Sequence, residues 1–371
     1  MSNALHASFA VLALMAFSGA MGLDAQALAQ PCGPLKEVAS LKMTLLPDGA
    51  RVGVPLTING TPVLLLVDTG AGMSSLTGPA AAQLGMRQRN SDAMHLVNAD
   101  GAAIHRYYLA DNFQLGRLAA KNVPFMQNVD IDEARISGAI GPDLMVHYDV
   151  EMDFSQQRLT YFSQDHCPGH VVHWSSDAVT QVPIGIAARA KDYPPPLVAG
   201  AAIDFPSDLL QTVLTRAVAP VLGTDIRTQV MLDGHVFAAN IDTGLDYSTI
   251  NSKAAQDYFD VPPDRHPSGA SETHQDWPAQ VGSGTEAVTV TGWRAQHRFH
   301  TLSFGGVTVT NPLFVLKPGP LGVHKAGAPE PPDITIGMNV LHKLHLYFAF
   351  GERRLYVSAA GQAQAETDRS P

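Results

Sequence analysis

Short runs of hydrophobic residues divide this chain, and two of these runs end in the same tripeptide. Residues 63–67 lead directly into an Asp-Thr-Gly sequence at 68–70, and residues 236–241 lead into a second copy at 242–244, 174 positions later. Before each run stands an Asn-Gly or Asp-Gly pair, whose glycine lies eight residues ahead of the aspartate. Because such pairs favour tight hairpin turns, each copy predicts a strand, a turn and a second strand that ends at the aspartate.

The match between the two halves continues after the tripeptides. Each aspartate is followed by strand-like residues (75–76 and 249–250) and then by a helix-like stretch (78–84 and 252–259). Residues 139–144 match residues 335–340, and a closing hairpin pattern follows each at the same distance. The offset grows from 174 to 196 between the early and late landmarks, so the second copy carries about 22 extra residues in its middle. A repeat of this kind predicts one structural unit built twice.

These motifs resemble the aspartic proteases of the retropepsin and pepsin group. Each lobe of that family carries an apolar-apolar-Asp-Thr/Ser-Gly turn and, much later, an apolar-apolar-Gly motif with Asp or Asn two residues on. Both copies here fit, over residues 40–162 and 180–358. The resemblance implies a mostly β fold of two similar β-barrel lobes related by a pseudo-two-fold axis, with both lobes fused in one chain.

The resemblance also implies roles for the residues of the two tripeptides. Asp68 and Asp242 are expected to form a catalytic pair of carboxylates. The expected supporting residues are two threonines that bond across the axis and two glycines that permit a tight turn: Thr69, Thr243, Gly70 and Gly244. Pepsin-like enzymes place Ser or Thr after the glycine, but this chain has Ala71 and Leu245. Alanine is usual there in retropepsins, whereas leucine fits neither pattern.

Two carboxylates held about 3 Å apart share one proton, because both cannot ionise cheaply. The ionised partner can then take a proton from a water molecule while the protonated partner polarises a peptide carbonyl. This chemistry needs no metal, no cofactor and no covalent intermediate, and its substrate is a polypeptide. The alternative hypothesis is a peptide-binding protein of the same fold without turnover, which Leu245 favours.

Enzymes of this kind cover the cleft with a mobile hairpin. The candidate in the first lobe is the turn at residues 97–102, which includes Asn98, Asp100 and Gly101. In the second lobe the Gly-rich residues 281–285 are the candidate. An ordinary surface hairpin is the alternative at both places.

Composition agrees with a globular chain divided into two lobes. The 371 residues contain 45% hydrophobic and 16% charged residues, and suit an N-terminal lobe at 30–170, a C-terminal lobe at 171–360 and a frayed tail at 361–371. The formal net charge is −10 without a Lys/Arg run, so nucleic acid is not an expected partner. One chain supplies both halves of the site, which favours a monomer.

The N-terminal residues predict export from the cytoplasm. Residues 1–29 resemble a signal peptide, with an apolar stretch from Phe9 to Leu23 followed by Ala-Leu-Ala at 27–29, although no Lys or Arg precedes the apolar stretch. A membrane anchor is the alternative, but glycines interrupt the short run, so no stable membrane insertion is expected after cleavage. A periplasmic or secreted location follows.

In such a compartment the two cysteines of the chain, Cys32 and Cys167, predict one disulfide. The closed loop would stabilise the fold by about 4 to 5 kcal/mol in the chain-entropy model. Two unrelated thiols are the alternative.

Two further features have mainly structural interpretations. Residues 187–226 form an insertion that the first copy lacks, with helical spacing at 207–218, and surface decoration is favoured over a bridge between lobes. His342 and His345 would share one helical face at a spacing of three, but no third ligand stands at a recognised spacing, so no metal site is expected.

Overall fold

The computed structural model describes residues 32–90, 96–97, 103–131, 133, 135–176, 179–186, 198–199, 203–204, 226–262, 295–317 and 332–361. The expected signal peptide, the flap turn with Asn98, Asp100 and Gly101, the helix at 207–218, the Gly-rich segment at 281–285 and all but the first residue of the tail lie outside the described residues.

The first lobe is a strongly curved sheet built around the strand that leads to Asp68. In spatial order its strands run β18-β11-β10-β3-β4-β13-β5-β12-β9-β6, with β2 beside β3 and β19 beside β11. Their bounds are β2 (Thr44–Leu45), β3 (Val52–Ile58), β4 (Thr61–Val67), β5 (Ser75–Thr77), β6 (Gln88–Asn90), β9 (Arg106–Ala110), β10 (Phe113–Leu115), β11 (Leu118–Lys121), β12 (Val123–Asn128), β13 (Gly138–Ile140), β18 (Val198–Ala199) and β19 (Ile203–Asp204).

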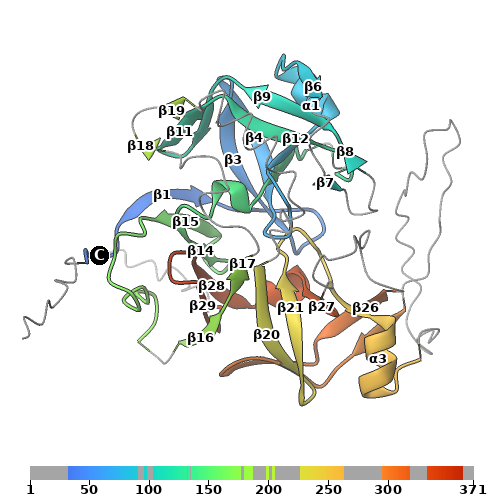
Figure 1. The fold of residues 1–371 in the computed structure, drawn as a ribbon. Helices are drawn as coiled ribbons and strands as arrows, with labels where there is room; N and C mark the ends of the chain where they lie inside the picture. Colours follow the sequence, from blue (N-terminus) through green and yellow to red (C-terminus); the bar gives the residue numbers. More distant parts are fainter. Residues whose placement is uncertain are drawn as a thin grey trace, which may run out of the picture. The chain divides into compact units, whose positions relative to one another are not determined.

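The second lobe repeats this plan, and Figure 1 shows it in yellow to orange opposite the blue and green first lobe. Its order is β23-β26-β22-β27-β21-β20-β24-β25, with β17 beside β20. The bounds are β17 (Gly185–Ile186), β20 (Ile226–Leu232), β21 (His235–Ile241), β22 (Ser248–Asn251), β23 (Gln296–Arg298), β24 (Thr301–Phe304), β25 (Val307–Thr310), β26 (Leu313–Lys317) and β27 (Ile334–Ile336).

Strand register shows that the two lobes are copies of one unit. In the first lobe β13 runs parallel to β4 and places Ile140 beside Val67. In the second lobe β27 runs parallel to β21 and places Ile336 beside Ile241. In both lobes the inserted short strand also pairs antiparallel with the strand after the aspartate loop. The duplicated β architecture predicted from the sequence is therefore confirmed.

The hairpin turns form at the Asn-Gly and Asp-Gly pairs, as the sequence predicted. Asn59 and Gly60 adopt φ values of 49° and 80°, and Asp233 and Gly234 adopt 43° and 87°. These left-handed conformations suit Asn, Asp and Gly and match the twist of the flanking strands.

Two short helices begin at capping side chains. Thr77 caps α1 (Gly78–Gln83) by accepting a hydrogen bond from the Ala80 amide, and Asn251 caps α3 (Ser252–Phe259). One turn of helix also follows each Gly motif, as η1 (Pro142–Leu144) and α4 (Met338–Leu341).

A third sheet joins the lobes, in the order β1-β15-β14-β28-β29-β16. Its strands are β1 (Glu37–Lys42), β14 (Asp149–Asp153), β15 (Arg158–Phe162), β16 (Thr180–Pro183), β28 (Leu344–Ala349) and β29 (Arg354–Ala359). The closing hairpins of the two copies, β14–β15 and β28–β29, meet where β14 pairs antiparallel with β28. Backbone hydrogen bonds between β14 and β28 therefore connect the two copies.

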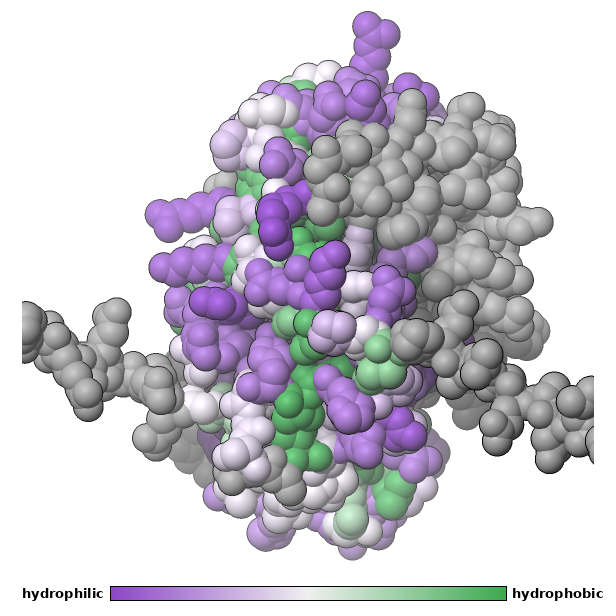
Figure 2. Space-filling model, turned by 90° about the vertical axis from the view of Figure 1, so that its left-hand side faces the viewer, coloured by the Kyte–Doolittle hydropathy of each residue, from purple (hydrophilic) through white to green (hydrophobic). Residues whose placement is uncertain are grey.

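Residues from both lobes contribute to one hydrophobic cluster, including Phe113, Phe125, Phe304 and Phe314. The face drawn in Figure 2 is mostly hydrophilic, with a narrow hydrophobic band. Within the described ranges, no helix has the length and hydrophobicity to cross a membrane.

The N-terminal residues are tied to the end of the first lobe. Cys32 and Cys167 are disulfide-bonded, which confirms that prediction. Beside them, Gly33 donates to the Asp165 carbonyl at 3.0 Å and accepts from the Cys167 amide at 3.1 Å. The strands β18 and β19, which lie past the expected lobe boundary at 170, pair with β11 of the first lobe. That boundary and the role of the whole insertion stay predictions.

The joining sheet also holds a buried cluster of histidines and carboxylates that the sequence did not predict. Glu151 Oε1 lies 2.9 Å from His345 Nε2 and 3.2 Å from His173 Nε2. Trp174 stacks on His345 with ring centroids 4.4 Å apart. Burial opposes ionisation of Glu151, but the hydrogen bonds from the two histidines outweigh it and lower its pKa to about 2.

We expect Glu151→Gln to lower the free energy of unfolding by about 2 to 4 kcal/mol, less than for a fully buried pair because His173 is half exposed. The lowered pKa of Glu151 stabilises the fold fully when the pH is above the ordinary glutamate pKa. The raised pKa of His173 stabilises the fold fully when the pH is below the ordinary histidine pKa, where the ring is protonated. Urea unfolding should therefore show the largest deficit between about pH 4.5 and 6.5.

The matched control is Glu133→Gln, which removes a surface ion pair with Arg51 at 3.5 Å and should cost less than about 1 kcal/mol. Equal losses in the two variants would contradict a special role for the buried cluster.

Candidate active site

The two aspartates of the repeated tripeptides occupy equivalent places at the ends of β4 and β21. The Asp68 amide donates to the Ile140 carbonyl at 3.0 Å, and the Asp242 amide donates to the Ile336 carbonyl at 3.0 Å. The parallel strands β13 and β27 therefore fix where each aspartate loop leaves its sheet.

Reciprocal hydrogen bonds between Thr69 and Thr243 connect the two loops. Each threonine amide donates to the other threonine's Oγ1 at 3.0 Å. Each hydroxyl then donates at 2.8 Å to a carbonyl of the opposite strand, Thr69 to Ile241 and Thr243 to Val67. Both threonines are fully buried. The pattern is the same in both directions, as expected for loops related by a two-fold axis.

The glycines allow the loops to approach closely. A Cβ atom on Gly70 would lie 2.3 Å from Asp242 Cγ, and one on Gly244 would lie 2.4 Å from Asp68 Cγ. Real Cβ atoms do not make such contacts, so neither position accepts a side chain without movement of the opposite aspartate. Each carboxyl group therefore packs directly against the glycine of the other loop.

The two carboxyl groups lie close enough to influence each other's ionisation. Burial raises the pKa of Asp68, and burial together with the negative charge of Asp68 raises the pKa of Asp242 well above its ordinary range. Both residues nevertheless keep part of their surface exposed. Such a pair holds a proton that an isolated surface aspartate would have lost, while solvent can still reach it.

Backbone amides are the donors next to each carboxylate. The amides of Gly70 and Ala71 favour ionisation of Asp68, and those of Gly244 and Leu245 do the same for Asp242. The side chains of Ala71 and Leu245 bring no hydroxyl to these positions.

A second layer of polar residues supports the loops from behind. In the first lobe Asp143 Oδ1 accepts 2.8 Å hydrogen bonds from the Ser74 amide and hydroxyl, and Ser74 Oγ accepts from the Gly141 amide at 2.9 Å. Sequence reasoning noted the Asp/Asn position of the motif but missed the serine. The signal was a serine six residues after each catalytic-type aspartate.

The second lobe repeats the arrangement with an amide in place of the carboxylate. Asn339 Oδ1 accepts 2.8 Å hydrogen bonds from the Ser248 amide and hydroxyl, and Ser248 Oγ accepts from the Gly337 amide at 3.0 Å.

The expected flap is framed by a strand pair. The strand β7 (Leu96–Val97) pairs antiparallel with β8 (Ala103–Ile104), so the chain returns on itself around the candidate turn. Asn98, Asp100 and Gly101 themselves lie outside the described residues, and their role stays a prediction.

The two histidines considered as metal ligands lie in different elements. His342 ends α4, where its ring bonds to the Met338 carbonyl, whereas His345 lies in β28 and contacts Glu151. The idea of one shared helical face is therefore wrong, because the helix ends before His345. Among the described residues no His/Cys/Asp/Glu group has the arrangement of a metal site.

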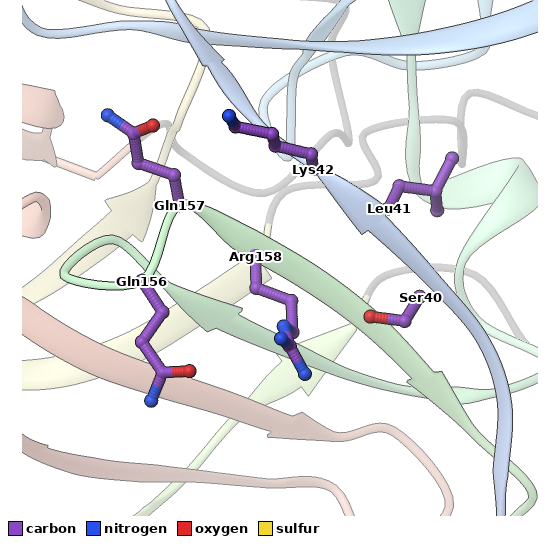
Figure 3. Close-up of a pocket in the computed structure, with 6 residues that line it drawn as sticks. All are labelled: Ser40, Leu41, Lys42, Gln156, Gln157 and Arg158. Atoms are coloured by element: carbon purple, nitrogen blue, oxygen red, sulfur yellow. The ribbon is translucent and has the colours of Figure 1, made fainter. Parts of the chain in front are cut away.

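A shallow surface pocket lies apart from the aspartates. It is bordered by Ser40, Leu41 and Lys42 of β1, by the turn residues Gln156 and Gln157, and by Arg158 at the start of β15, as Figure 3 shows. None of these residues belongs to the two loops, so the pocket is no part of the candidate site.

Comparison with known proteins agrees with this geometry. Residues 54–144, which include the first aspartate loop and its Gly motif, match the aspartyl protease family model. Both lobes show the mostly β architecture and the paired Asp-Thr-Gly loops that the resemblance to the retropepsin and pepsin group implies. This match, together with the fold, supports a protease function. A search of the curated proteins finds no match.

Solved structures that are similar to this chain include two that cover most of it. The aspartic proteinase from Irpex lacteus has 12% identity and a TM-score of 0.47, and covers 89% of this chain and 100% of its own. Basic 7S globulin from soybean has 9% identity and a TM-score of 0.43, and covers 90% and 98%. A retropepsin-like aspartic protease from Rickettsia conorii has 19% identity and a TM-score of 0.26, and covers 34% and 92%. These are likenesses of fold and not of activity.

We expect Thr243→Val to destabilise the fold by about 2 to 4 kcal/mol. The change leaves the Thr69 amide and the Val67 carbonyl buried without partners, and each such group costs about 1 to 3 kcal/mol. Thr243→Ser keeps the hydroxyl and should retain most of the stability. Denaturant unfolding measures both variants, and a valine variant as stable as the serine variant would contradict a stabilising role for these bonds.

Proposed function

We propose that the protein is an aspartic endopeptidase in which Asp68 and Asp242 activate a water molecule for attack on a peptide bond. The observation that carries this proposal is the paired geometry: two carboxyl groups, each packed against the glycine of the opposite loop. Thr69 and Thr243 serve as positioning residues that hold the two loops together.

The raised pKa values indicate that the pair keeps one shared proton, so one aspartate is ionised while the other is protonated. The ionised aspartate is the general base that deprotonates water, and the protonated one is the acid that donates to the carbonyl oxygen. When the tetrahedral intermediate collapses, the proton gained from water passes to the departing amine and a hydroxyl of the intermediate returns a proton to the acid. The cycle therefore consumes one water and needs no cofactor.

The substrate of this proposal is a polypeptide held in extended form beside the two loops. The hairpin framed by β7 and β8 is the element that would cover it. The disulfide between Cys32 and Cys167 and the apolar N-terminal sequence support action outside the cytoplasm, in the periplasm or after secretion.

A second candidate is a peptide-binding protein that keeps the fold without turnover. The observation that favours it is Leu245, a bulky residue where a small one is expected beside Asp242. Its backbone amide still favours the ionised Asp242 carboxylate, so the leucine side chain does not remove a backbone donor.

The decisive experiment is hydrolysis of unfolded casein by the protein and by its Asp68→Asn and Asp242→Asn variants. Each variant removes one partner of the acid–base pair, so we expect the rate to fall at least about 100-fold. The exposed Asp111→Asn change is the matched control and should leave the rate unchanged. A pepstatin-type inhibitor should block the unmodified protein.

The same assay gives the pH dependence. Activity should peak at weakly acidic pH and fall as pH rises, because the raised pKa values mean that the pair then loses its shared proton. Hydrolysis that survives both substitutions, or a maximum below about pH 3, would reject the proposed mechanism. Peptide binding without hydrolysis at any pH would favour the second candidate.

A further inference from the structure

The two lobes anchor their aspartate loops with different chemical groups at one equivalent position. Asp143 receives the two Ser74 bonds in the first lobe, and Asn339 receives the two Ser248 bonds in the second. The hydrogen-bond lengths are the same, so the acid and the amide fill the same role at their first oxygen.

The remaining atom of each side chain distinguishes the two residues. Asn339 Nδ2 donates to the Leu313 carbonyl at 2.8 Å. Asp143 Oδ2 is buried and has no hydrogen-bond partner among the described residues. An ionised carboxylate offers only acceptors, whereas a protonated carboxyl has one acceptor oxygen and one donor, as the amide has.

Asp143 is buried among neutral groups. It is 2% exposed, and the groups that favour its ionisation are the Ser74 hydroxyl and amide and the amides at 143 and 144. Its negative charge also influences the phenol of Tyr161, whose hydroxyl is buried and has no hydrogen-bond partner among the described residues; Tyr148 packs edge-on against Tyr161. Burial raises the pKa of Asp143 to about 6.

A short chain of contacts links this carboxyl to the candidate catalytic loop. Asp143 holds Ser74, Ser74 Oγ holds the Gly141 amide, and the neighbouring Ile140 carbonyl holds the Asp68 amide. The fit is tight, because a Cβ atom on Gly141 would lie 3.0 Å from Asp143 Oδ1. A change in charge at Asp143 therefore acts on the backbone that positions Asp68.

We propose that Asp143 works in its protonated form, as the first-lobe counterpart of Asn339, and that loss of its proton to solvent loosens the anchor behind Asp68. Asp143 is thus a positioning residue that makes the first lobe sensitive to pH, while the amide makes the second lobe insensitive. The effect on stability stands independently of catalysis, and only the effect on activity rests on the proposed protease function.

The sign of the effect follows from proton linkage. The folded state binds this proton more tightly than the unfolded chain, so the contribution of Asp143 to stability is complete at low pH and is lost as pH rises to about 6 and beyond. The shift from the ordinary value of 3.8 to about 6 corresponds to a folding equilibrium on the order of 100-fold less favourable once the carboxyl is ionised.

The test compares the protein with Asp143→Asn and with the reciprocal variant Asn339→Asp. Thermal unfolding is followed from about pH 3 to about pH 7.5, a span that brackets the range between the ordinary pKa of Asp143 and its raised value. We expect Asp143→Asn to match the unmodified protein at the acidic end and to have a higher Tm above pH 6. Asn339→Asp should behave in the opposite way, with a Tm deficit that grows as pH rises.

Casein hydrolysis provides the second readout. Relative to the unmodified protein, Asp143→Asn should keep its activity at acidic pH and extend the upper limb of the pH profile to higher pH. Asn339→Asp should shift that limb to lower pH. A merely structural role would change the rate by the same factor at every pH.

The outcomes separate this inference from the proposed function. A Tm difference between Asp143→Asn and the unmodified protein that does not change with pH, or an Asp143→Asn variant that is destabilised at every pH, would overturn the inference. The expected Tm pattern in a protein that never hydrolyses casein would support the protonated anchor and reject the protease function alone.

Discussion

The reciprocal bonds between Thr69 and Thr243 are the constraint on which the rest of the site depends. They are the point where two loops from distant parts of the chain exchange both side-chain and backbone hydrogen bonds, within a fully buried volume. Since an unpaired buried amide or carbonyl is costly, the two loops are strongly held in one relative position. Only that position brings Asp68 and Asp242 together over the opposite glycines.

Duplication explains why this constraint can be satisfied twice at once. Each lobe presents the same strand, the same turn and the same short parallel partner strand behind the aspartate. The joining sheet extends the relationship, because β14 and β28 pair antiparallel as equivalent strands of the two copies. The fold therefore brings two carboxyl groups together. Burial and the repulsion between their negative charges raise the pKa values, so that the pair keeps one proton.

The sequence predicted the parts of the molecule that are encoded locally and twice. The Asn-Gly and Asp-Gly turns have the left-handed backbone that only such residues adopt easily, and the strand endings at Asp68 and Asp242 follow from the apolar runs before them. The Ser74 and Ser248 anchors were missed because they depend on contacts across about 70 to 90 residues of chain. The spacing of His342 and His345 was compatible with one helical face, because spacing alone does not show that α4 ends at Leu341.

The sequence also did not predict the cluster around Glu151. Glu151 lies in β14, His345 lies in β28 and His173 lies in the segment after the disulfide, and these segments have no sequence pattern in common. The pKa of Glu151 shifts in the opposite direction to the pKa values of the aspartate pair. Hydrogen bonds from two histidines lower the Glu151 pKa to about 2, whereas burial raises the pKa values of Asp68, Asp242 and Asp143. Burial opposes ionisation in all four residues, so the partners decide the outcome. Glu151 has imidazole partners, whereas the donors to Asp143 Oδ1 are the Ser74 hydroxyl and the Ser74 amide.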